Sequence, residues 1–172
     1  MRPAVYSAPW SASLRVMTAL SCLLLLGVAI SGILTSQGDP IRLAVVFGVP
    51  LLILLGALPF AVTGYRIEGG SLCISRPLWT TRVSLAGIIG AEADSEAMSG
   101  SVRTLGNGGL FSFTGRFRNR RLGSYRAWVT DPKRAVVIEL PGRTIVVSPD
   151  RPLEMASILQ ELSESGHIAS RT

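Results

Sequence analysis

The sequence predicts a two-helix transmembrane hairpin followed by a mainly β domain, a seven-stranded antiparallel bent sheet or partly open barrel with one C-terminal helix. Residues 16–34 and 43–62 are two charge-free apolar runs. Residues 65–148 contain short alternating runs separated by turn sequences, which is typical of strands. Residues 150–166 change to the apolar period of an amphipathic helix.

Each apolar run is long enough to cross a bilayer, because about 20 helical residues span a hydrocarbon core of ~30 Å. Lipid offers no partner to open backbone groups, so both runs are expected to be helical. Gly38-Asp39-Pro40 between them is a turn sequence. The predicted divisions are an N-terminal segment at 1–15, a transmembrane hairpin at 16–62, a β domain at 65–166 and a tail at 167–172.

Basic residues flank one side of the predicted hairpin. The loop between the two runs holds a single arginine, Arg42, whereas five lie outside the hairpin: Arg2, Arg15, Arg66, Arg76 and Arg82. The positive-inside bias predicts a multi-pass protein of the cell (inner) membrane, with its N-terminus and its β domain in the cytoplasm. An alternative interpretation takes residues 1–31 as a cleaved signal peptide and leaves the second run as an anchor.

The turn Gly69-Gly70 joins the strands predicted at 65–68 and 71–75 into a β-hairpin. Residues 94–109 are rich in serine and glycine and are expected to be a loop. The other predicted strands are 79–85, 110–114, 125–130, 135–140 and 143–148, with a weaker one at 88–93.

A helix is expected after the last strand, with Asp150 as its cap and Gly166 at its end. Met155, Leu159 and Leu162 form its apolar stripe, so one face should pack against the sheet.

Four loose motifs carry a resemblance to a known family: residues 65–72, 85–89, 111–115 and 147–150. With the order of the elements, they make residues 65–166 resemble the bacterial pleckstrin-homology-like (PH) domains of small membrane proteins. The resemblance implies the PH fold and an association with membranes, and it implies little about chemistry. Eukaryotic relatives that grip phosphoinositides use basic residues around the first hairpin, where this chain has Glu68-Gly69-Gly70 and no lysine.

The strongest basic feature is Arg116-Phe117-Arg118-Asn119-Arg120-Arg121, expected to be the loop between the fifth and sixth strands. One interpretation is a solvated loop, paired in part with Glu92, Asp94 or Glu96. The other is a lipid-binding segment that orients the domain, because each basic side chain near an anionic leaflet contributes ~1 kcal/mol. In that case Phe117 between the arginines dips into the membrane interface.

Composition and motifs argue against catalysis. Cys22 and Cys73 are expected to be small apolar fillers, and the one histidine, His167, lies in the predicted tail. No cysteine or histidine pair has metal-ligand spacing, and no nucleophile elbow or phosphate-binding glycine loop occurs. We therefore expect no catalytic residue, no cofactor, no metal and no evident small-molecule substrate.

A net charge of +6 favours anionic lipid over nucleic acid, for which the sequence has no motif. The function predicted first is a protein-interaction or scaffold module at the inner leaflet, because sheet edges accept strands and grooves accept peptides. The alternative is an anionic-lipid-sensing or orienting domain that uses the basic segment. The expected partners are the lipid bilayer and either a membrane protein or a second copy of the chain.

Overall fold

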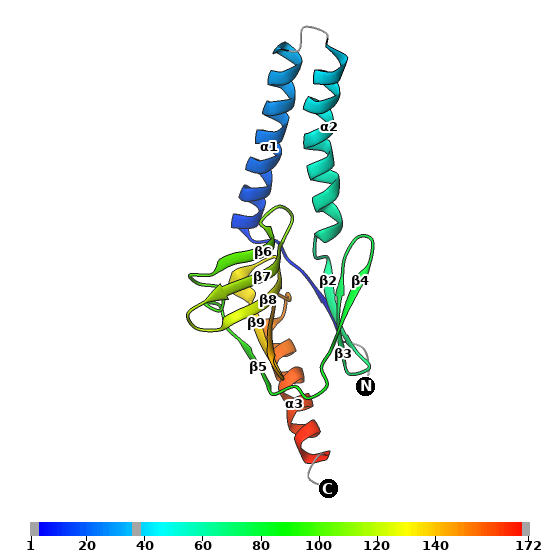
Figure 1. The fold of residues 1–172 in the computed structure, drawn as a ribbon. Coiled ribbons are helices and arrows are strands. Elements are labelled where there is room, and N and C mark those ends of the chain that lie inside the picture. Colours follow the sequence, from blue (N-terminus) through cyan, green and yellow to red (C-terminus); the bar gives the residue numbers. More distant parts are fainter. Residues whose placement is uncertain (1–3, 36–38, 170–172) are drawn as a thin grey trace.

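The computed structural model describes residues 4–35 and 39–169, with side chains up to Ser165. Helix α1 (Ala12–Thr35) and helix α2 (Pro40–Ala57) stand side by side, and α2 ends in a 3-10 turn, η1 (Leu58–Phe60). Figure 1 shows both helices projecting from one end of a β-rich domain, with the C-terminal helix, Pro152–Ala169, extending at the other end. Both are long and apolar enough to cross a membrane.

Most of the apolar side chains of this helical hairpin are exposed. Leu24 on α1 is 68% exposed and Leu52 on α2 is 73% exposed. The helices approach closely at Gly32, where a Cβ would lie 2.2 Å from a Val46 methyl group. Asp39 caps α2 by accepting a hydrogen bond from the Ile41 N–H at 2.9 Å. An exposed apolar surface of this extent is matched by hydrocarbon rather than by water.

The β domain contains two sheets. One has the order β1-β2-β3-β4 and the other the order β5-β9-β10-β8-β7-β6. The first sheet is made of β1 (Ala4–Ser7), β2 (Gly64–Glu68), β3 (Ser71–Ser75) and β4 (Thr80–Ser84). The second is made of β5 (Gly90–Ala93), β6 (Val102–Gly108), β7 (Phe113–Asn119), β8 (Gly123–Val129), β9 (Val136–Leu140) and β10 (Arg143–Val147). Helix α3 (Pro152–Ala169) packs on β5 and β9.

This architecture confirms the predicted fold class, although the described strands number more than seven and close no barrel. The glycine turn of the first hairpin is confirmed, because Gly69 and Gly70 have φ angles of 55° and 66°. The loop prediction for residues 94–109 is wrong where β6 lies. As an edge strand, β6 pairs with β7 alone and carries a bulge between Arg103 and Leu105, so its side chains show no alternation.

Three other expectations are corrected. The sheet is not wholly antiparallel, because β8 and β10 pair in parallel. Helix α3 continues through Gly166 to Ala169, since a glycine inside a helix costs only about 1 kcal/mol. The Asp150 carboxylate, expected to cap α3, accepts a hydrogen bond from the Ser7 N–H of β1 at 3.2 Å.

The hydrophobic core has two parts, one on each face of the six-stranded sheet. The larger part lies between the two sheets and beneath α3, where Trp128, Ile74 and Met155 are fully buried. On the opposite face, Phe117 stacks on Tyr125 with ring centroids 6.1 Å apart, and the buried Ala97 belongs to the same cluster. The sheet therefore has apolar contacts on both faces along β8.

A buried hydroxyl joins the two sheets. The Tyr65 hydroxyl on β2 donates to the Trp128 carbonyl at 2.7 Å and accepts from the Ser148 N–H at 3.2 Å. The Ser148 hydroxyl in turn accepts from the Thr130 N–H at 2.8 Å. Burial raises the pKa of Tyr65 to about 12.

The helical hairpin is docked directly on the β domain. The Thr18 hydroxyl of α1 donates to the Gly109 carbonyl and accepts from the Phe111 N–H, both at 3.2 Å. The Ser112 hydroxyl donates to the Phe60 carbonyl of η1 at 3.0 Å. The turn between β6 and β7 thus contacts the base of both helices, as Figure 1 also shows.

Replacing Tyr65→Phe should lower the free energy of unfolding by about 1–3 kcal/mol, because it leaves buried polar groups unpaired. The native pKa of about 12 exceeds the unfolded value of 10.0, so this stabilisation is complete below pH 10 and is lost as pH rises toward 12. Thermal unfolding of the full chain in detergent measures both effects. If the wild type and Tyr65→Phe lost equal amounts of stability at alkaline pH, the assignment of this pH dependence to Tyr65 would be wrong.

Replacing Gly115→Ala should destabilise the pairing of β6 with β7 by about 3 kcal/mol, since backbone strain and overpacking add. Its φ is 141°, and a Cβ would lie 2.1 Å from the Leu105 carbonyl oxygen. Gly123 is the matched control, because its φ is also positive at 65° but a Cβ there meets open space. Gly123→Ala should cost about 1 kcal/mol in the same melting experiment; equal costs would show that the collision is relieved.

Candidate functional site

The segment expected to be a basic loop is divided between a strand and a turn. Arg116 and Arg118 lie on β7, which continues to Asn119, and only Arg120 and Arg121 lie in the turn that follows. The loop prediction is therefore wrong for the first four residues of the segment. Phe117 packs in the core, so alternation along β7 turns Arg116 and Arg118 to the other face of the sheet.

The end of this segment is held by contacts within the domain. Arg121 forms an ion pair with Asp94 at 2.7 Å, and the Asp94 carboxylate is only 10% exposed. The Asn119 side chain accepts from the Leu122 N–H at 2.7 Å and donates to the Ala97 carbonyl at 2.8 Å. Phe117 is buried and Arg121 is paired, whereas Arg116, Arg118 and Arg120 are exposed.

Arginines that are remote in the sequence meet Arg116 in an open groove of about 430 Å³. We call it the arginine groove; its arginines are Arg82, Arg116, Arg126 and Arg143. Arg116 and Arg126 are cross-strand partners on β7 and β8. The Arg126 guanidinium lies 4.7 Å from the ring centroid of Trp128, which also lines the groove.

A second cavity of about 480 Å³ lies at the base of α2 and shares Arg126 with the arginine groove. We call it the hairpin-base pocket; its lining includes Ala57, Phe60, Arg76, Arg103 and Arg126. The Arg76 guanidinium lies 5.9 Å from the Phe60 ring centroid and 5.5 Å from that of Trp79. These two rings meet edge to face at 5.3 Å.

The charge in both cavities is uncompensated. Among the residues that the structure describes, no aspartate or glutamate lines either one, and Arg76, Arg103 and Arg126 take part in no ion pair. Burial, and then the charge of Arg126, lowers the pKa of the Arg76 guanidinium. Guanidinium groups without counter-charges favour an oxyanion, which accepts hydrogen bonds from their planar donors.

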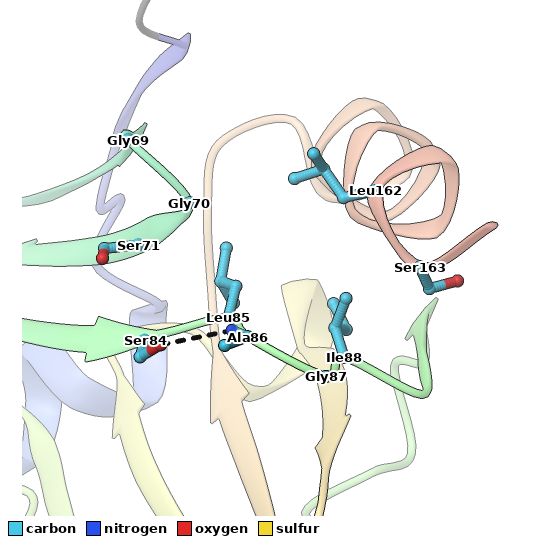
Figure 2. Close-up of a pocket in the computed structure, with 10 residues that line it drawn as sticks. All are labelled: Gly69, Gly70, Ser71, Ser84, Leu85, Ala86, Gly87, Ile88, Leu162 and Ser163. Carbon is cyan, nitrogen blue, oxygen red and sulfur yellow. Dashed lines mark hydrogen bonds between the residues drawn. The ribbon is translucent and has the colours of Figure 1, made fainter. Parts of the chain in front are cut away.

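A third cavity has a different chemistry. Figure 2 shows it between the first hairpin turn, the segment that follows β4 and α3. Gly69, Leu85, Ile88 and Leu162 are among the residues that line its volume of about 550 Å³. Its described lining holds no charged side chain, so the cavity suits an apolar contact rather than an ion.

Sequence reasoning named Arg76 and Arg82 only as charges that flank the helical hairpin, and it did not single out Arg103, Arg126 and Arg143. All five stand apart from the basic run at 116–121. One local signal existed. Arg126 lies two residues before Trp128 on β8, so a charged and a buried aromatic side chain share one face of a strand. The other arginines come together only through the pairing of distant strands.

Side chains that bind metal ions are dispersed in the described part of the chain. It holds no cluster of three or more histidine, cysteine, aspartate or glutamate side chains suited to a metal ion. Cys22 and Cys73 are free cysteines. The side chain of His167 lies outside the described ones.

Comparison with known proteins bears on the β domain. A family model described as a bacterial PH domain matches residues 63–163, from the residue before β2 into α3. Neither the curated proteins nor the solved structures gave a match. The matched region is more than half of the chain and agrees with the resemblance inferred from residues 65–166. The chain therefore belongs to the bacterial PH domain family.

Proposed function

We propose that this chain is a membrane-anchored interaction module, acting by binding rather than by catalysis. The helical hairpin anchors the PH domain in the membrane, and the free edge of β6 accepts an extended strand from a protein partner. Such strand addition uses main-chain hydrogen bonds for affinity and side-chain contacts for selectivity. The PH family by itself does not fix the partner.

The observation that carries this proposal is the difference between β6 and the other edge strands. The edge of β1 is covered by Arg151, which donates to the Val5 carbonyl at 3.0 Å. The edge of β5 is covered by Gln160, which accepts from the Ala91 N–H at 3.2 Å. The edge strand β4 receives a hydrogen bond from Arg143 at the Ser84 carbonyl. No such cover over β6 is found in the described part of the chain.

Exposed apolar side chains add to the binding capacity of β6. Val102 and Leu105 are each 67% exposed, and on a strand with an open edge such residues favour pairing with another strand. The C-terminal end of β6 leads into Gly109, which Thr18 of α1 contacts. A bound strand would therefore be held at a fixed position beside the membrane anchor.

A second candidate function is orientation of the domain on anionic lipid by the basic segment. Arg118 and Arg120 favour it, because both are exposed and neither forms an ion pair among the described residues. The hairpin already anchors the chain, so lipid contacts of these arginines would select an orientation.

A photo-crosslinker at Leu105 in native membranes should give a discrete protein adduct, because the open edge of β6 binds a strand. The matched control is Leu153 on α3, which is 77% exposed. Val102→Lys combined with Thr104→Pro should abolish the adduct by blocking the edge. Lipid adducts alone at Leu105, or an equal protein adduct at Leu153, would contradict the proposal.

The N-terminus and the PH domain should both lie on the cytoplasmic side. The pairing of Ala4–Ser7 in β1 with β2 supports a common side, since the two strands flank the helical hairpin. Protease added to intact cells should therefore spare an epitope placed after Thr172, whereas protease added to opened cells should remove it. Loss of the epitope from intact cells would contradict this orientation.

A further inference from the structure

We propose that the hairpin-base pocket binds a phosphate group, and that this phosphate belongs to the headgroup of an anionic phospholipid beside α2. The pocket uses Arg76, Arg103 and Arg126, none of which belongs to the basic segment at 116–121. The inference goes beyond the proposed function, because acceptance of a strand at β6 needs no anion.

Three positive charges line this pocket from separate parts of the fold. Arg76 follows β3, Arg103 lies at the bulge of β6, and Arg126 lies on β8. Neighbouring like charges repel one another, and no carboxylate lines the described pocket to offset them. Phosphate supplies both the missing negative charge and the geometry that guanidinium groups bind in pairs of hydrogen bonds.

Arg76 provides an independent observation that points to a ligand. Its Nε is buried and has no hydrogen-bond partner within the described residues. Buried N–H groups in folded proteins almost always have an acceptor. The Arg76 Nε has none within the described chain, so a bound ligand is the group expected to supply one. Phe60 and Trp79 lie against the same guanidinium and hold it in place at the pocket.

The location favours a lipid over a free anion. Ala57 and Phe60 come from the end of the second apolar helix, so one wall of the pocket continues into the surface predicted to face hydrocarbon. Leu78 and Trp79, on the turn between β3 and β4, are 74% and 39% exposed. Exposed tryptophan and leucine beside arginine are typical of the bilayer interface, where headgroup phosphates lie.

This pocket is separate from the turn of the first hairpin. Figure 1 shows the turn between β2 and β3 at the end of the sheet away from α1 and α2. Gly69 and Gly70 of that turn line the uncharged cavity of Figure 2. A phosphate site in the hairpin-base pocket therefore does not depend on the first β-hairpin, whose residues include no lysine.

The test uses the purified full chain in a mild non-ionic detergent, with thermal shift and native mass spectrometry as readouts. The probes are short-chain phosphatidylglycerol, inorganic phosphate and a diacylglycerol without phosphate. Phosphatidylglycerol should bind and raise the melting temperature, and Arg76→Gln should weaken its affinity by at least about tenfold. Arg66→Gln on β2 is the matched control, because Arg66 does not line the pocket, and it should leave the affinity unchanged.

A second measurement distinguishes loss of the binding site from misfolding of the variant. Without any anion, Arg103→Gln should melt at or above the wild-type temperature, because it removes one of three neighbouring positive charges that line the pocket. With phosphatidylglycerol, the same variant should show a smaller shift than the wild type. Equal weakening by Arg66→Gln would overturn the site, and equal affinity for inorganic phosphate would overturn the lipid assignment. The crosslink at Leu105 should persist in Arg76→Gln, so the two proposals fail separately.

Discussion

The antiparallel pairing of β1 with β2 is the constraint on which the rest of this structure depends. The chain leaves the sheet at Ser7, forms the whole helical hairpin, and returns to the same sheet at Gly64, the register partner of Ser7. The hairpin is thus inserted between two neighbouring strands, and its two ends are held at one edge of the domain. Gly64 allows this closure, because a Cβ there would lie 2.9 Å from the Tyr6 carbonyl oxygen. The same side of the β domain is therefore always next to the base of the two helices.

That fixed face gathers the groups that suit binding. Thr18, Gly109 and Phe111 close the contact between α1 and the turn of β6 and β7, and Phe60 joins η1 to the pocket below it. The open edge of β6 starts beside this contact, and the hairpin-base pocket lies across the same strand pair. A protein strand and a lipid phosphate would therefore occupy adjacent and different surfaces.

Electrostatics separates two groups of arginines that look alike in composition. Arg121 is neutralised by Asp94, and Arg151 by Glu154 at 2.8 Å, so these side chains contribute to local order. Arg76, Arg103 and Arg126 have no such partners among the described residues, and the fold holds them near one another without compensation. Repulsion between uncompensated charges lowers the stability of the fold, and the same charges favour the binding of an anion. The distinction depends on which strand lies beside which, and the clustered run at 116–121 does not reveal it.

The sequence by itself determined the elements that local chemistry specifies. The apolar runs predicted α1 and α2, Gly69-Gly70 predicted the first hairpin, and Met155 with Leu159 predicted the buried face of α3, because length, turn geometry and helical period are properties of neighbouring residues. Only the tertiary structure decided the pairing of β1 with β2, the parallel pairing of β8 with β10, and the meeting of Arg76, Arg103 and Arg126. Strand partners are chosen by long-range burial and hydrogen bonding, so residues far apart in the chain share a site for reasons that no short segment contains.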